Sequence, residues 1–135
     1  MFESNTRQVA FVRDRPGIQN QVESRQDLGI AVDRLSGDTR YETSLAVAAA
    51  SVDAGLYAPR TWLATGRAFP DALVAGPAAA SRHAVLLLVD GGGMTASSAS
   101  AAWFEDVVFE RVVLLGGPAA VSEGVAGVVA DLLGL

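Results

Sequence analysis

The sequence predicts an α/β fold, specifically a three-layer sandwich in which a short, mostly parallel sheet is flanked by helices. The apolar runs at 84–89 and 112–115 are continuous, which is typical of strands buried on both faces. Such runs alternate along the chain with longer stretches of helix-forming residues, an order that favours parallel strands joined by helical crossovers. The 135 residues are enough for one domain with a real core.

The first helix has clear signals at both ends. Thr39 is followed three residues later by Glu42, which is the spacing of a capping box. Helix-forming residues fill the stretch from Arg40 onward, and Gly55 is a natural residue just after a helix end. A strand at 61–65 follows.

The second helix begins near Pro70, whose missing N–H would be unpaired in a first turn anyway. Asp71 also suits a first turn, because the helix dipole stabilises a negative charge there. We expect this helix to run to about Arg82 and to kink at Gly76-Pro77. Capping explains Pro70 and Asp71 but not Arg67 or Phe69.

The remaining elements follow in chain order: a strand at 84–89, a loop at 90–93, a helix over about 96–105, a strand ending in Gly116-Gly117, and a last helix that Ser122 caps and that ends before Gly134. We find no internal repeat.

Residues 1–33 are polar and rich in Gln and Arg, unlike the rest of the chain. They contain strand-like runs at 9–12 and 30–32 and a turn at 16–17. We interpret 1–33 as an N-terminal extension, either a linker or part of an adjacent module, and 34–135 as the folded module. The start lacks the apolar core of a signal peptide, so the chain is intracellular, a piece of a longer exported protein, or wrongly started.

Composition argues against several classes of function. The net charge is −5 and all ten basic residues are Arg, which disfavours a general nucleic-acid binder. The apolar runs are too short to cross a bilayer, so we expect no membrane partner. Without Cys, and with His83 as the only His, thiolate chemistry is excluded and no metal-ligand spacing is present. We therefore expect no metal, no cofactor and no catalytic residues.

Three loops follow the predicted strands, at 65–67, 90–93 and 116–118. Ligands of open parallel sheets bind outside the carboxyl ends of the strands, and helix N-termini there favour anions. Neither glycine-rich loop matches a dinucleotide or phosphate-loop motif, so we interpret these glycines as tight turns and not as a nucleotide site. A nucleotide- or phosphate-handling enzyme is supported only by fold analogy.

Four ordered motifs resemble a known family. They are RLSGDTRYETSLAVA (34–48), LATGRAFPDALVAGPAAA (63–80), AVLLLV (84–89) and VVLLGGPAAVSEGV (112–125). Together they resemble the cell wall binding repeat 2 module of Gram-positive surface proteins, over about three quarters of the chain. Departures include Thr65 where the family usually has Ser, and Ala84 where it usually has Pro.

The resemblance implies a non-catalytic module at the cell wall, outside the cell, that binds an anionic wall polysaccharide such as a teichoic-acid-like glycan. It also implies tandem sister modules or a homotrimer as partners. The candidate ligand-binding residues at or beside the motifs are Arg34, Arg40, Arg67, Phe69, Asp71, Gly116, Gly117 and Ser122.

Two interpretations of these motifs stay open. Arg forks and helix N-termini can hold anions without an overall positive charge. The motifs can equally preserve packing, with the small residues of 75–80 allowing close helix contacts in an oligomerisation or scaffold module without a ligand. An Arg40–Asp71 ion pair would order the loop that holds Phe69, and the charge of −5 would repel a polyanion at low salt.

Overall fold

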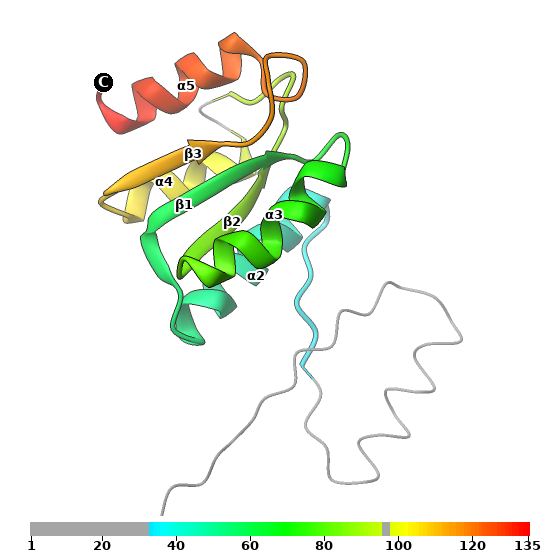
Figure 1. Ribbon diagram of the computed structural model, residues 1–135, viewed down its shortest axis with the longest axis vertical. Helices are drawn as coiled ribbons and strands as arrows, with labels where there is room; N and C mark the ends of the chain where they lie inside the picture. The colour runs from blue at the N-terminus through cyan, green and yellow to red at the C-terminus, as the bar shows by residue number, and fades with distance from the viewer. Residues whose placement is uncertain (1–32, 96–97) are drawn as a thin grey trace, which may run out of the picture. The chain divides into compact units, whose positions relative to one another are not determined.

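The computed structural model describes residues 33–95 and 98–135. The strand-like runs predicted at 9–12 and 30–32, and the turn at 16–17, lie outside these residues. Residues Ser36–Leu135 form one compact unit. In chain order its elements are α2 (Arg40–Asp53), β1 (Tyr57–Thr65), α3 (Pro70–Ser81), β2 (Ala84–Val89), the 3₁₀ helix η1 (Ala99–Ala102), α4 (Trp103–Asp106), β3 (Arg111–Leu114) and α5 (Glu123–Leu133), as Figure 1 shows.

The three described strands form one parallel sheet in the order β2-β1-β3. The central strand β1 pairs with both neighbours, so that Trp62 lies opposite Leu86 on one side and Val113 on the other. The predicted α/β class and its parallel sheet are confirmed. Because the three strands are parallel, their carboxyl ends all lie along the same edge of the compact unit.

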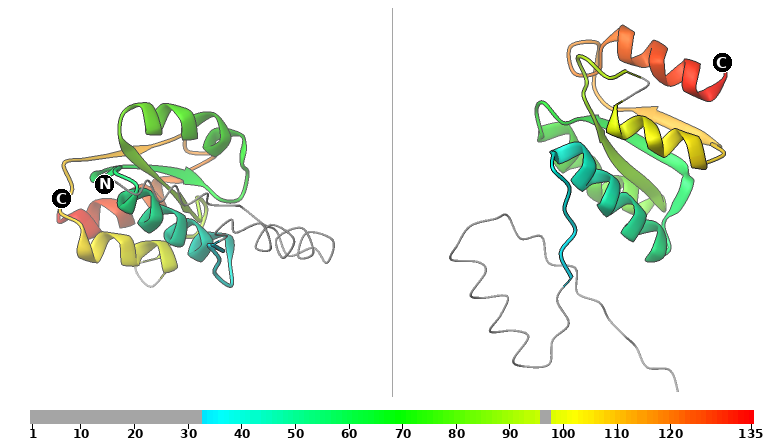
Figure 2. Two further views of the ribbon diagram at one scale, coloured as in Figure 1. Left: turned by 90° about the horizontal axis from the view of Figure 1, so that it is seen from below. Right: turned by 180° about the vertical axis from the view of Figure 1, so that it is seen from behind.

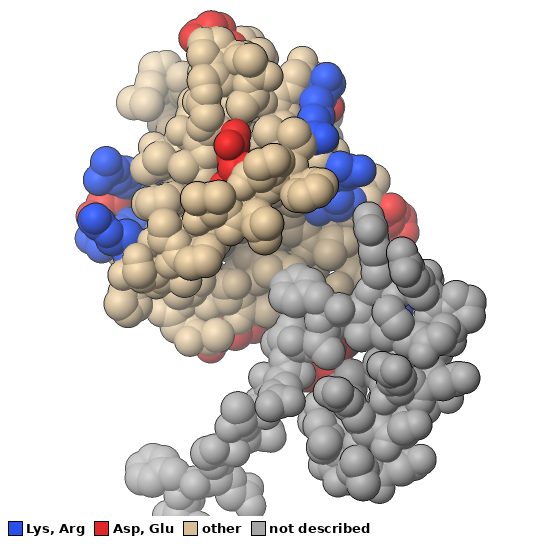
Figure 3. All heavy atoms as spheres, turned by 45° about the vertical axis from the view of Figure 1, so that its right-hand side comes forward, with Lys and Arg blue, Asp and Glu red and all other residues tan. Residues whose placement is uncertain are grey.

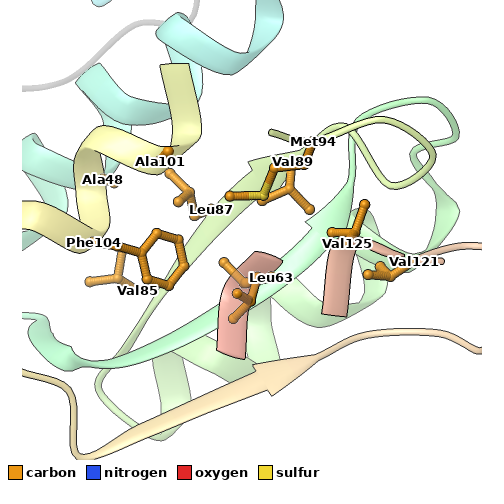
Figure 4. Packing of buried hydrophobic residues seen from close by; sticks show 11 residues of the cluster. Ala48, Leu63, Val85, Leu87, Val89, Met94, Ala101, Phe104, Val121 and Val125 are labelled. Carbon is orange, nitrogen blue, oxygen red and sulfur yellow. The ribbon is translucent and has the colours of Figure 1, made fainter. Parts of the chain in front are cut away.

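Helices cover both faces of this sheet, giving three layers (Figures 1 and 2). α3 lies alone on one face, and α2, α4 and α5 lie on the other. The main core fills the second face, where Leu63, Val85 and Leu87 are fully buried among side chains from those three helices (Figure 4). Burial of these branched side chains is the main force that holds the layers together.

The two tryptophans lie on opposite faces of the sheet. The indole Nε1 of Trp103 in α4 donates to the buried Thr61 hydroxyl at 2.9 Å, which gives this large ring a partner for its polar atom. Successive strand residues alternate between faces, so Trp62 points away from Thr61 and Leu63, toward the side that α3 covers.

Helix ends agree with the sequence. Thr39 and Glu42 form a capping box, and Ser122 accepts a bond from the Val125 N–H at the start of α5. Gly55 and Gly134 both have positive φ just after the helices that they end. Each device satisfies backbone groups that a helix terminus leaves without a partner.

Two elements differ from the prediction. β1 begins at Tyr57, four residues before Thr61, because an irregularity in its pairing with β2 lets the strand continue through Pro59. The helix predicted over 96–105 is, in its described part, a 3₁₀ turn followed by one turn of α4. α3 ends at Ser81, in agreement with the predicted end near Arg82, and contains Pro77, where the kink stays a prediction.

Leu63→Ala should lower the free energy of unfolding by about 2–5 kcal/mol, because the fully buried side chain would leave a cavity. Val108→Ala is the matched control, since that side chain is 91% exposed, and should change stability by less than about 0.5 kcal/mol. Urea denaturation of both variants measures the difference. Equal losses in the two variants would contradict the assigned core.

Candidate functional site

The loops that follow the three strands gather at the carboxyl-end edge of the sheet and are hydrogen-bonded to one another. The Gly66 N–H donates to the Val89 carbonyl at 2.8 Å, which joins the loop after β1 to the end of β2. The Ser122 N–H donates to the Gly91 carbonyl at 2.7 Å, which joins the loop after β2 to the start of α5. We call these three loops and the start of α2 the carboxyl-end edge.

An ion pair connects two of these loops. Arg67, after β1, donates through Nε to Oδ1 of Asp90 and through Nη2 to Oδ2 at 3.4 Å. Asp90 also accepts from the Gly92 N–H at 3.2 Å, and the Arg67 N–H donates to the Thr65 hydroxyl at the same distance. The forked pairing fixes the plane of the guanidinium.

The pair sets the electrostatics of the carboxyl-end edge. The hydrogen bond from Arg67 lowers the pKa of Asp90 from its ordinary value, against a smaller opposing effect of burial. The same hydrogen bond raises the pKa of Arg67. Burial, followed by the charge of Asp90, raises the pKa of the Tyr41 hydroxyl. Asp90 is therefore ionised and Tyr41 neutral at neutral pH.

Arg40 and Tyr41 hold the loop after β1 from the side of α2. Arg40 donates through Nη1 to the Gly66 carbonyl at 2.5 Å. The Tyr41 ring lies so close to Gly66 that an added Cβ would be 2.5 Å from its Cε1 atom. Gly66 is therefore required by close approach, and the motif residues Arg40 and Tyr41 position the backbone just before Arg67.

The expected Arg40–Asp71 ion pair is not formed. Arg40 bonds the Gly66 carbonyl instead, and Asp71 makes no ion pair with any described residue. Its carboxylate lies beside Gly116, where an added Cβ would be 2.9 Å from Oδ2. Since Gly116 also has a φ of 95°, a side chain there would be both strained and crowded. Asp71 thus lies between the start of α3 and the loop after β3.

Phe69 occupies the residue before α3 and caps nothing with its side chain, which is 74% exposed. Gly117 is exposed in the loop after β3 and accepts from the Ala120 N–H at 2.8 Å. Ser122 serves as the cap of α5 through its hydroxyl. Arg34 is exposed and precedes the compact unit, and its position relative to the other candidates is not assigned.

Sequence reasoning missed Asp90, the residue that binds Arg67. Its only signal was position, since an acidic residue directly after an apolar strand must lie at the same edge as other strand ends. Within the described ranges, no group of three or more His, Asp or Glu side chains is arranged to hold a metal ion. No helix in the same ranges is both long and apolar enough to cross a membrane.

A separate apolar surface lies on α3. Phe69, Leu73 and Val74 are all more than 70% exposed, although each is large and apolar. The inner side of the same helix is closely packed, since Ala75 and Ala79 are buried. In Figure 3 a broad area with little charge separates two groups of cationic side chains. We call Phe69, Leu73 and Val74 the α3 patch.

These features define a small parallel α/β module whose exposed arginines and apolar patch suit it to binding. The model of the family Cell wall binding domain 2 (CWB2) matches residues 34–126. The chain therefore belongs to this family, whose description indicates cell-wall binding.

A solved structure, Cwp8 from Clostridium difficile, has a similar fold, with a TM-score of 0.65 and 22% sequence identity. The similarity covers 86% of this chain and 18% of that chain, so the module matches a small part of a much longer protein. No curated protein matches this chain.

Asp90→Asn should lower the denaturation midpoint at neutral pH, because Arg67 loses its charged acceptor. The folded pKa of Asp90 lies below the unfolded value, near 3.9, so the contribution of the pair is complete above that value and is lost as the pH falls through the folded pKa. The midpoints of the wild type and the variant should therefore converge in acid. A difference that stays constant down to the lowest accessible pH would contradict the pairing.

Proposed function

We propose that the module binds an anionic secondary polymer of the Gram-positive cell wall, such as a teichoic-acid-like glycan, at the carboxyl-end edge. The observation that carries the proposal is the orientation of the Arg67 guanidinium. Asp90 holds this guanidinium through Nε and Nη2, while the side chain remains 60% exposed. Nη1 has no acceptor among the described residues and is available to a phosphate or carboxylate.

Two features next to Arg67 support a polymer over a small anion. Arg40 places a second exposed cation across Gly66, on the other side of the same loop. Phe69 offers an exposed ring two residues from Arg67, and aromatic rings pack well against the apolar faces of sugars. A chain with repeated charges and sugar units would use both arginines and the ring together.

The charge of the chain shapes how such binding would behave. With a net charge of −5, the module repels a distant polyanion, and salt screens that repulsion together with the local attraction. One site with two arginines, one of them already paired, predicts weak binding. Several modules acting on one polymer would raise the overall affinity without new contacts.

Arg67→Gln and Arg40→Gln should each reduce co-sedimentation of the purified chain with Gram-positive walls, and stripping the walls of secondary polymer with acid should abolish it. Arg60→Gln is the matched control. Arg60 is likewise an exposed arginine that pairs with a carboxylate, at 2.9 Å from Glu110, but it lies at the amino end of the strands. Its loss should leave binding unchanged.

The outcomes separate a ligand site from a packing role. Equal binding by Arg67→Gln, Arg40→Gln and the wild type would refute the placement of the site. Binding that survives acid stripping would refute the polymer as ligand. If a folded chain binds no wall preparation at low or moderate salt, Arg40 and Arg67 have only a packing role.

We also infer that the α3 patch packs against sister modules, as a homotrimer or within a tandem set. Three large apolar side chains exposed together on one helix cost solvation free energy in an isolated chain, at roughly 25 cal/mol per Å² of apolar surface. Contiguous patches of this kind mark interaction sites. This surface is independent of Arg67, so the two roles are compatible.

Leu73→Glu should abolish the three-chain species of the purified chain in sedimentation equilibrium, because it would bury a charge in the contact. Asp131→Asn changes an exposed acidic residue on α5 and serves as the control. A wild-type chain that forms no three-chain species at any concentration, or a three-chain species that tolerates Leu73→Glu, would contradict the inference.

A further inference from the structure

The two edge strands of the sheet, β2 and β3, differ in the hydrogen bonding of their outer sides. On the outer edge of β2, side chains engage both backbone groups of Leu88: its N–H donates to the Ser44 hydroxyl at 2.8 Å, and the Ser100 hydroxyl donates to its carbonyl at 2.8 Å. Both serines are buried, so these bonds are protected from water. Closing an edge in this way prevents another strand from pairing with it.

None of the residues that the structure describes closes the outer edge of β3 in this way. On the inner side, the Leu115 N–H donates to the Leu63 carbonyl at 2.9 Å, so the odd-numbered residues of this strand face β1. The N–H and C=O groups of Val112 and Leu114 therefore point outward. No described residue bonds to them from that side. Four consecutive residues, Arg111–Leu114, thus present an unpaired edge with three apolar side chains.

The spacing of these groups is self-complementary. If two copies of β3 lie antiparallel with a two-fold axis at Val113, Val112 of each copy lies opposite Leu114 of the other. Each of these two residue pairs then exchanges two hydrogen bonds, so that all the outward groups of Val112 and Leu114 are satisfied. We propose that the outer edge of β3 pairs with the same edge of a second copy, which joins two three-stranded sheets into one.

The charges next to the strand favour the antiparallel arrangement. A parallel pairing in register would place Arg111 beside Arg111 of the second copy, and like charges directly opposite are destabilising. In the antiparallel arrangement Arg111 lies opposite Leu115, and the two arginines are at opposite ends of the contact. Glu110 is already engaged with Arg60, so it adds no unpaired charge.

The side chains around the proposed two-fold axis also leave room for the second copy of β3. Val112 and Leu114 pack toward the main core, so Val113 points to the other face of the sheet. α3 packs on β2 and β1, and Val113 is only half-buried. The two copies of Val113 would form a pair without hydrogen bonds, in which Cβ atoms approach to roughly 4.5–5.5 Å.

A charge swap at the axis tests the proposal. In sedimentation equilibrium, Val113→Lys alone and Val113→Glu alone should each lose the two-chain species, since like charges would meet across the axis. An equal mixture of the two variants should regain it. Rescue by mixing requires that residue 113 of one copy faces residue 113 of the other, which packing through α3 does not.

Val112→Pro is the second test, because it removes an outward N–H without touching the bonds between β3 and β1. It should abolish the two-chain species while the chain stays folded, with stability lowered only by the lost packing of the Val112 side chain on the core. Val113→Pro is its counterpart, since that N–H points to β1, and should destabilise the fold itself.

Three results would overturn the proposal: a wild-type chain without a two-chain species, a two-chain species that persists in folded Val112→Pro, or single charge variants that mixing does not rescue. A three-chain species that Val112→Pro leaves intact, in a wild type without a two-chain species, would support the α3 patch and overturn pairing through β3. Wall binding is measured by co-sedimentation and pairing through β3 by sedimentation equilibrium. Failure of the wall-binding proposal can therefore be distinguished from failure of the pairing proposal.

Discussion

The close approach at Gly66 is the constraint on which the carboxyl-end edge depends. Gly66 directly follows β1; its N–H donates to the end of β2 and its carbonyl accepts from Arg40. The Tyr41 ring occupies the space where a side chain would begin. Because α2, β1 and β2 all meet at one backbone unit, the direction in which the chain leaves β1 is fixed. This fixed direction also sets the position of the Arg67 backbone, one residue further on.

Because the backbone before Arg67 is fixed, the pairing with Asp90 determines how the Arg67 guanidinium is oriented. Exposed ion pairs contribute little to stability in general, because water screens them and ordering two side chains costs entropy. Such ion pairs can instead fix the orientation of a side chain. In this module one carboxylate uses part of the fork of an arginine and leaves the rest outward. The same arrangement explains how a chain of net negative charge can present a local site for an anion.

Local signals made most of the fold predictable from the sequence. Thr39, Ser122 and Gly134 act within a few residues of the helix ends that they mark, so their chemistry is visible in a short window. The start of β1 was not visible, because Tyr57 to Arg60 lacks an apolar run and contains a proline. Long-range partners were beyond reach as well. Asp90 is 23 residues from Arg67, and nothing in the spacing distinguishes it from Asp71, which the sequence favoured as an ion-pair partner for Arg40.

The placement of the tryptophans has a practical consequence. Trp103 is bonded to Thr61 within the layer of α2, α4 and α5, whereas Trp62 lies on the opposite side of the sheet. The chain has two tryptophans in total, so each face carries its own fluorophore. Replacing either one with phenylalanine would leave a single emission that follows the loosening of one layer. Intrinsic fluorescence can thus distinguish an all-or-none unfolding from one in which α3 detaches before the main core.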